Sequence, residues 1–435
     1  MNALATYAFF GRKDKLLWIL DRLPSRIGLR HRGEKYDLLH LCANHNWKDV
    51  VNRLQKEYLL TSLSKDHAGR TLLHWAIDYD WDISKLDLGD YSSNELNAQD
   101  RDGLTAVHIA IVNRNLPALK HLVASGASYM ITDKNGMSPV HIAAEQGYGA
   151  GINFFIEMPE REFGRTKTGA SLLHLLALWS DGDILGRFVR IKQAKLDVVD
   201  KQRHTALHYA AMVDNALAAK QLVALGCKLE RRNASGMTPL HEAIRSGGVD
   251  TVKLLLKKGA NTRATDGFDQ SCLHLGLRYG HDDATAHFLA MEFDVNYADR
   301  FRITPLHRAC IRGKVEYIRK LRQHGAKWNP HDKYGRSPID LAVQHGKFAA
   351  VEEMILWLES EDASHHLLDN ALTLACELQL KAIEQLLEQS GAEVDRTKIK
   401  EKWLYLPGPV RGPNRWPLVR YDDSRPEANV SGKGI

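Results

Sequence analysis

The chain consists of short amphipathic stretches separated by turn-forming residues. Residues 205–211 read Thr-Ala-Leu-His-Tyr-Ala-Ala, in which a threonine suited to cap a helix precedes small apolar residues at helical spacing. A second stretch, Val-Lys-Leu-Leu-Leu at 252–256, leads to a Gly-Ala pair, and glycine favours the left-handed conformation that ends many helices. A turn rich in Asp, Asn and Gly follows such pairs, as at 133–136. The pattern predicts a unit of helix, turn, helix and projecting turn.

The four-residue word that opens this unit recurs at a nearly constant interval. Successive histidines at its last position lie 33 or 34 residues apart, at His40, His74, His108, His141, His174, His208, His241, His274 and His307. A further copy at 337–340 ends in Asp340. Several copies carry proline at the second position, where its missing N–H costs nothing because a helix begins there. Extending the register predicts a capping repeat at 1–36, repeats over 37–358 and a second capping repeat at 359–395.

A 33-residue period with the word Thr-Pro-Leu-His, as at 238–241, resembles the ankyrin-repeat family. The resemblance implies an all-α solenoid of about twelve helix-turn-helix units with β-turn fingers, in a curved, right-stacked array. One unit cannot bury its own apolar face, so neighbouring units must stack. Within this register the recurring histidines are expected to be structural, bonding across the turn between neighbouring repeats.

Some segments depart from the repeat pattern. The turn glycine is replaced by Arg203, Asp269 and Arg302, and the segments 86–97 and 157–161 are irregular. Each departure is either drift in a long array or a kink or docking point. Residues 396–435 are rich in proline and glycine without apolar periodicity, which indicates a flexible tail or an extended docking strand.

No residues combine into a catalytic or metal-binding motif. The chain has five cysteines, and each replaces a small residue of the repeat, as small buried hydrophobes do. His241 and Glu242 begin a metalloprotease word, but Arg245 stands where the second histidine belongs. Phosphate-binding loops, serine elbows and dinucleotide fingerprints are absent. We therefore expect a non-enzymatic chain with no cofactor, no metal and no small-molecule substrate.

The hydropathy of the chain argues against a membrane partner. The most continuous apolar run, at 16–20, is far shorter than the roughly 20 residues that a helix needs to cross a bilayer. The first residues lack the basic region and cleavage site of a signal peptide. The expected location is therefore cytoplasmic or nuclear.

The resemblance also indicates where a protein partner would bind. In this family partners generally contact the fingers and the exposed end of the first helix of each repeat, along the concave side. The matching positions here combine arginine with aromatic residues, the usual anchors of protein interfaces. The candidates are Tyr79, Trp179, Arg245, Phe268, Arg278, Tyr279, Arg300, Phe301, Arg312, Tyr334, Arg336 and His345. We expect an acidic partner segment along the C-terminal half; the alternative is a solvated basic face.

Charge is concentrated at the two ends. The net charge is +6, and residues 1–36 and 396–435 each carry +5, so the residues between them carry −4. Basic ends leave open contact with nucleic acid, directly or through a bound partner. The expected function is a non-catalytic interaction scaffold or adaptor. The more specific hypothesis is a regulatory role such as transcription coregulation. The alternatives are a nucleic-acid-associated protein and the regulatory ankyrin half of a larger signalling protein.

Overall fold

The structure is a computed structural model. It describes residues 3–22, 41–42, 45, 47, 49–51, 53–54, 65–83, 88, 91–160, 162–179, 183–289, 294–361 and 368–394. The predicted tail at 396–435 and His40 lie outside them, as do residues 23–36 of the predicted N-terminal cap.

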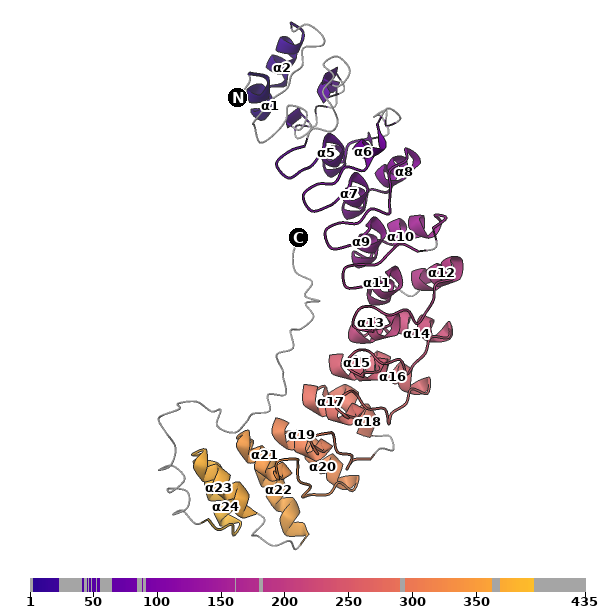
Figure 1. Cartoon of the computed structure of the whole chain (residues 1–435). Helices are drawn as coiled ribbons and strands as arrows, with labels where there is room; N and C mark the ends of the chain where they lie inside the picture. The colour runs from indigo at the N-terminus through magenta and orange to yellow at the C-terminus, as the bar shows by residue number, and fades with distance from the viewer. Residues whose placement is uncertain are drawn as a thin grey trace.

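Two rows of short helices form a curved array (Figure 1). Helices α1 (Ala3–Phe9) and α2 (Lys13–Leu20) form a pair at the N-terminal end. The row nearer the concave side contains α5 (Leu72–Asp78), α7 (Ala106–Val112), α9 (Pro139–Glu145), α11 (Leu172–Trp179), α13 (Ala206–Met212), α15 (Pro239–Ser246), α17 (Cys272–Tyr279), α19 (Pro305–Arg312), α21 (Pro338–Gln344) and α23 (Asp369–Glu377). The outer row contains α8 (Leu116–Ala124), α10 (Gly149–Ile156), α12 (Asp183–Lys192), α14 (Ala216–Ala224), α16 (Val249–Lys257), α18 (Asp282–Leu289), α20 (Val315–Gln323), α22 (Phe348–Ser360) and α24 (Lys381–Gln389). A single turn of helix, α6 (Ser93–Leu96), lies between α5 and α7 in the chain.

The recurring word places the start of each inner helix. Its first residue, Thr105 in α7, has extended backbone angles and its hydroxyl caps the helix, while His108 occupies the third helical position and completes a capping box. The same arrangement recurs in α5, α9, α13, α15, α17, α19 and α21. Several helices end at a left-handed glycine, such as Gly247 after α15 and Gly313 after α19.

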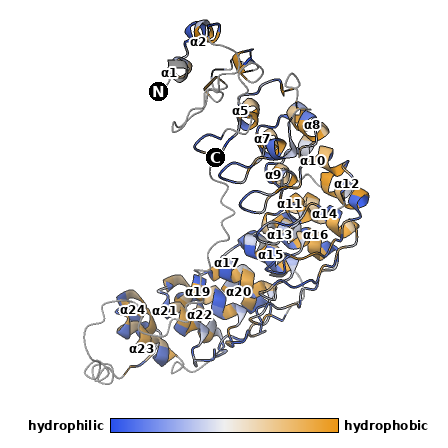
Figure 2. Cartoon of the chain, turned by 45° about the horizontal axis from the view of Figure 1, so that its top comes forward, coloured by the Kyte–Doolittle hydropathy of each residue, from blue (hydrophilic) through white to orange (hydrophobic). Residues whose placement is uncertain are grey.

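Each helix packs on the helices of the neighbouring repeats and on its partner within the repeat. From α5 to α23, each inner helix contacts the next inner helix along the array. Outer helices contact the next outer helix from α10 to α18 and from α20 to α24. The buried apolar side chains come from helices of both rows. The fingers are hydrophilic (Figure 2). The resulting core is long rather than compact, and its two described clusters meet at α17. These features confirm the predicted all-α solenoid of stacked helix pairs.

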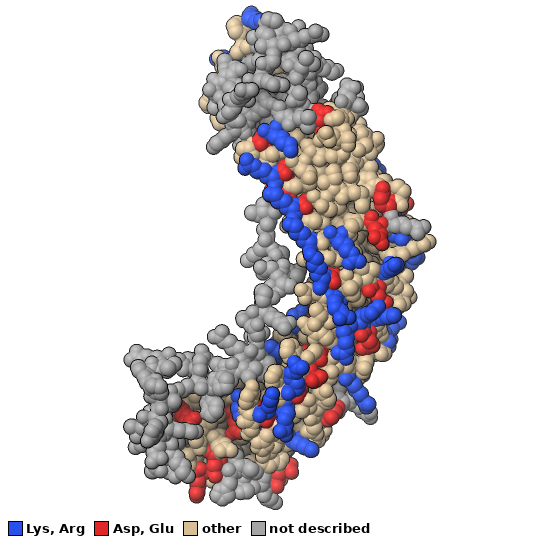
Figure 3. Space-filling model, in the orientation of Figure 1, with Lys and Arg blue, Asp and Glu red and all other residues tan. Residues whose placement is uncertain are grey.

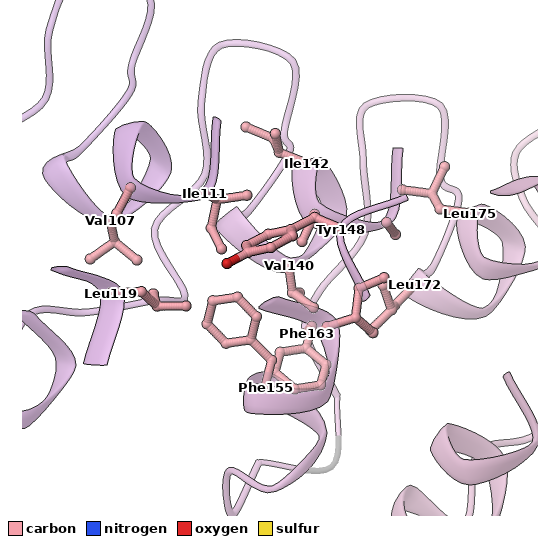
Figure 4. Close-up of a cluster of buried hydrophobic side chains, with 14 of the residues drawn as sticks. Val107, Ile111, Leu119, Val140, Ile142, Tyr148, Phe155, Phe163, Leu172 and Leu175 are labelled. Carbon is pink, nitrogen blue, oxygen red and sulfur yellow. The ribbon is translucent and has the colours of Figure 1, made fainter. Parts of the chain in front are cut away.

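The core between repeats is close-packed, as the region around α10 illustrates (Figure 4). Phe155 is fully buried and meets Phe163 edge-on, with ring centroids 6.4 Å apart. The Tyr148 hydroxyl donates to the Arg114 carbonyl of the preceding repeat at 3.0 Å. A side chain at Gly151 would collide with the Tyr148 ring at 2.6 Å, so only glycine fits there.

The departures from the repeat are accommodated within the fold. Arg203, Asp269 and Arg302, which replace the finger glycine, keep its left-handed backbone, with φ of 61°, 59° and 58°. In the irregular segment after α10, the buried Lys192 donates to the carbonyl of Met158. The repeat architecture therefore persists where its sequence signature weakens.

Candidate protein-interaction face

Each finger is built around one acidic or polar side chain, eight residues before the histidine position. Asp133 accepts hydrogen bonds from the backbone N–H of Asn135 and of Met137, both at 2.8 Å. These bonds close a turn that the aspartate side chain stabilises locally. The same pair of bonds is made by Asp66, Asp100, Asn233, Asp266, Asp299 and Asp332.

The fingers are joined to one another by a backbone hydrogen bond per repeat. The N–H of Lys134 donates to the Asp102 carbonyl at 3.0 Å, and the N–H of Lys167 donates to the Asn135 carbonyl at 2.9 Å. The same bond is made by the N–H of Arg101, Lys201, Ala234, Gly267, Arg300 and Lys333. The residue that joins each finger to the preceding one therefore always lies seven positions before the histidine position.

The recurring histidines join the repeats a second time. In His208, Nδ1 accepts from the Thr205 N–H at 3.1 Å, so the ring proton must be on Nε2, which donates to the Met237 carbonyl at 3.0 Å. The same bridge to the next repeat is made by His74, His108, His174, His274 and His307. Burial lowers the pKa of His208 to about 4, so the ring stays neutral. These six histidines thus bond across neighbouring repeats.

Two histidines depart from the common bridge. His241 donates instead to the Ala264 carbonyl at 3.1 Å, within a finger whose base is closed by a bridge between Thr265 and Ser271. His141 is buried, and its Nε2 has no hydrogen-bond partner within the described protein. His141 belongs to the repeat that contains the irregular 157–161 segment, so the lost bridge coincides with the departure in sequence.

The N-terminal candidates for partner binding lie at the ends of inner helices. Trp179 ends α11 with 45% of its surface exposed. Tyr79 follows α5 and stacks on Trp75, with ring centroids 5.4 Å apart. Both aromatic rings are accessible to a partner and lie in different repeats.

Arg245 is exposed, but its guanidinium is part of a buried charge cluster. Its Nη2 lies 2.7 Å from Glu242, which is almost fully buried. The second carboxylate oxygen of Glu242 accepts from the Asn233 amide at 2.8 Å and lies 3.7 Å from Nε2 of His204. His204 also contacts Asp200 at 3.2 Å. Arg245 therefore stabilises the fold in addition to facing solvent.

This cluster keeps His204 charged. Burial acts to lower the His204 pKa, but the hydrogen bond with Asp200 and the interaction with Glu242 outweigh it and raise the pKa to about 9. Burial alone would raise the Glu242 pKa, yet His204 and Arg245 lower it. In this ion network Glu242 pairs with Arg245 and His204, and His204 also pairs with Asp200.

The other C-terminal candidates pair basic groups with aromatic rings. Arg278 lies over the Tyr279 ring at 5.5 Å, and Arg300 lies over Phe268, in the finger of the preceding repeat, at 5.6 Å. A cation held against an exposed ring forms a compact anchor with both charge and apolar area. Arg312 is exposed beside the left-handed Gly280, where an added Cβ would meet its Nη2 at 2.6 Å.

The remaining candidates lie in two C-terminal fingers and at the end of α21. Tyr334 is 51% exposed and lies under Arg336 at 5.1 Å, while Arg336 is also bound to the buried Asp332 at 2.7 Å. Phe301 is half-buried, and His345 is the C-cap residue of α21. We call the set of Arg245, Phe268, Arg278, Tyr279, Arg300, Phe301, Arg312, Tyr334, Arg336 and His345 the C-terminal concave surface, after the side of the array on which the sequence interpretation predicts them.

The described residues offer little reactive chemistry. No group of three His, Cys, Asp or Glu side chains among them is arranged to hold a metal ion. Burial raises the thiol pKa of Cys227 to about 12, and it raises the pKa of Cys272 and Cys310 as well. These thiols remain protonated and unreactive near neutral pH.

A family model described as ankyrin repeats in three copies matches residues 84–166, 173–266 and 273–364, more than half of the chain. The chain belongs to the ankyrin-repeat family. Ankyrin repeats mediate protein–protein binding and are typically non-catalytic. None of the described ankyrin helices is both long enough and apolar enough to pass through a bilayer.

The similar proteins are diverse and much longer. Human transient receptor potential cation channel subfamily A member 1 is 25% identical over 60% of this chain and 28% of its own length. Mouse Rabankyrin-5 is 27% identical over 54% of this chain and 23% of its own length. Human SH3 and multiple ankyrin repeat domains protein 2 is 29% identical over 44% of this chain and 10% of its own length. The matched segments thus span less than a third of each relative.

The sequence interpretation did not follow two columns of the ankyrin register along the whole array. One is the finger aspartate position, noted only as a turn signal, whose side chains close the turns. The other is the position one residue later, which is basic in four successive repeats and of which only Arg300 was a candidate. Both recur with the same period as the histidine, so aligning all columns of the repeat would have found them. The buried role of Glu242 had no such signal, because it occurs in one repeat only.

Proposed function

We propose that this ankyrin chain is a non-catalytic scaffold or adaptor that holds a protein partner on its C-terminal concave surface. The observation that carries the proposal is the repeated pairing of a cation with an exposed aromatic ring, at Arg300 with Phe268 and at Arg336 with Tyr334. Such pairs combine large contact area with charge at low conformational cost. They suit an acidic partner segment that carries apolar side chains.

The proposal extends to regulation through the bound partner, with transcription coregulation as one form and a cytoplasmic or nuclear location. A second form is a regulatory ankyrin region within a larger signalling protein. One relative is named as a cation channel subfamily member, which gives that form its support. Direct nucleic-acid contact through the basic ends rests on their charge of +5 each, and those ends lie mainly outside the described residues.

The test compares two variants of the full chain that carry similar substitutions on opposite faces. The concave variant combines Tyr279→Ala, Arg312→Glu and Tyr334→Ala, all at exposed positions. The convex variant combines Leu217→Ala, Lys253→Glu and Phe348→Ala, which lie on outer helices. Thermal unfolding would establish that both remain folded.

Cross-linked capture from cells would then identify proteins bound by the wild type. We expect a partner that the convex variant keeps and the concave variant loses, and whose cross-links map to an acidic segment. A partner that both variants keep equally would contradict the proposed surface. Binding that instead required residues 396–435 and fell steeply with salt would favour the nucleic-acid alternative.

A further inference from the structure

Four successive fingers in the N-terminal half carry a basic side chain at the same repeat position. They are Arg101, Lys134, Lys167 and Lys201, which we call the basic ladder. All four are exposed, and none forms an ion pair with another described residue. Figure 3 shows basic side chains in a line along the concave side of this part of the array. The charges are therefore available to a partner.

The backbone of the ladder is fixed by the fold. The residue that carries the charge is also the one whose N–H joins its finger to the preceding finger, at 2.8 Å for Arg101 and 3.0 Å for Lys201. Each Cα is thereby held at a set spacing, although the side chain itself remains free. The spacing follows the packing of helix layers, about 8–10 Å. A fixed row of charges binds with less ordering cost than a set of charges on flexible loops.

The acidic neighbours modulate the ladder unevenly. Asp100, Asp133 and Asp200 stand directly before Arg101, Lys134 and Lys201, and their carboxylates are committed to backbone N–H groups of the finger. Asp102 adds an exposed carboxylate to the first finger.

The third finger has Thr166 in place of the aspartate. Arg165 precedes that threonine and donates to the Val199 carbonyl at 2.7 Å. The fourth finger adds the exposed Arg203. The positive potential should therefore be strongest at Lys167 and Lys201.

We propose that the basic ladder binds an extended acidic segment of a protein partner, with carboxylates at every third residue. In a polyproline II conformation three residues complete one turn and advance about 9 Å, so every third side chain faces the same way at roughly the spacing between fingers. A nucleic acid strand carries a charge at every nucleotide and gains nothing from a three-residue period. The proposal deepens the proposed protein-binding function and assigns it a second surface, separate from the C-terminal concave surface.

The chain itself supplies a way to lengthen the ladder. After Lys201 the same position holds Ala234 and then Gly267, so the row of charges is interrupted until Arg300 and Lys333. Ala234 is exposed and its N–H makes the same inter-finger bond, to the Gln202 carbonyl at 2.8 Å. The substitution Ala234→Lys would therefore add a fifth charge in register without changing the backbone.

The test measures fluorescence anisotropy of labelled peptides with the full chain. One peptide has glutamate at every third position and spans five fingers; a second has the same composition with its glutamates in one block. The ladder variant combines Lys134→Glu, Lys167→Glu and Lys201→Glu. The control variant makes the same charge change at exposed residues of α14 and α16, with Lys220→Glu, Lys253→Glu and Lys257→Glu.

We expect the periodic peptide to bind at least several-fold more tightly than the block peptide, and the ladder variant to lose about tenfold in affinity, more than the control variant loses. Ala234→Lys should strengthen binding of the periodic peptide. Equal binding of both peptides, or equal losses in both variants, would overturn the proposal. So would tighter binding of a single-stranded oligonucleotide of equal charge. The ladder variant leaves the C-terminal concave surface unchanged. Failure of the ladder proposal would therefore leave the proposed function standing, since the cell-capture experiment tests that function separately.

Discussion

His174 donates a hydrogen bond from Nε2 to the main-chain oxygen of His204 at 3.0 Å, and this bond joins one repeat to the next. His141, one repeat earlier, has the same capping role but lacks the bridge. We therefore expect His174→Ala to destabilise the chain by about 1–2 kcal/mol more than His141→Ala, since only the former breaks a bond between repeats. Urea unfolding of both variants would measure the difference. Equal losses would show that the bridge contributes nothing beyond the cap.

Buried neutral histidines should make the array sensitive to mild acid. Burial lowers the pKa of every described histidine at the last position of the four-residue word below its ordinary value of 6.5. The pKa falls to about 4 in His141, His208, His241 and His307. The unfolded chain then binds more protons than the folded chain between these values, so the stabilisation is complete above pH 6.5 and is lost as the pH falls toward 4.

The measurement is the urea midpoint at several pH values between 7.5 and 4.5, where about pH 5–6.5 lies above the range in which most carboxylates titrate. A clear fall in the midpoint within that window is expected. A flat profile down to pH 5 would contradict the neutral state of the histidines.

His204 should have the opposite dependence on pH. Its pKa is raised to about 9 by Asp200 and Glu242 despite burial, so its ion pairs stabilise the fold fully below pH 6.5, and this contribution is lost as the pH rises through 9. His204→Gln should lower the free energy of unfolding by about 1–2 kcal/mol near pH 6.5. Above pH 9 the variant and the wild type should differ little in stability. Thermal unfolding of the variant and the wild type across this range would measure the gap. A gap that stayed constant with pH would exclude a charged His204.

Replacing the non-glycine residues in left-handed finger positions by glycine should raise the stability of the fold. Arg302 has φ of 58° and Asp269 has φ of 59°. Arg302→Gly should stabilise the chain by about 0.5–1 kcal/mol, the balance of relieved backbone strain and added unfolded-state entropy. Asp269→Gly should gain less, because aspartate tolerates this conformation better. Melting temperatures would rank the two variants.

The reverse substitution provides the control. Gly136 has φ of 74°, and an added Cβ would meet the backbone nitrogen of Lys167 in the next finger at 2.9 Å. Gly136→Ala should therefore lower the melting temperature. If it raised the melting temperature, or if Arg302→Gly lowered it, the assignment of strain to the fingers would be wrong.

Much of the fold could be predicted because its signals are local and periodic. Thr238 and Pro239 mark the start of a helix by capping and by the missing N–H, and the same chemistry repeats in every unit. The bridging role of His208 followed from its place in the register. The missing bridge of His141 did not, because it depends on how the next finger is placed relative to the ring.

The sequence by itself determined the period, the helix pairs, the capping residues and the columns of residues that share one face. Only the tertiary structure decided which charges on those faces are engaged and which are free. Arg245 and Lys167 are both exposed and basic, yet Arg245 is held by Glu242 at 2.7 Å, whereas the Lys167 side chain has no described ion pair. The physical reason is burial: stacking of the neighbouring repeats takes Glu242 out of water and makes its pairing with Arg245 and His204 necessary.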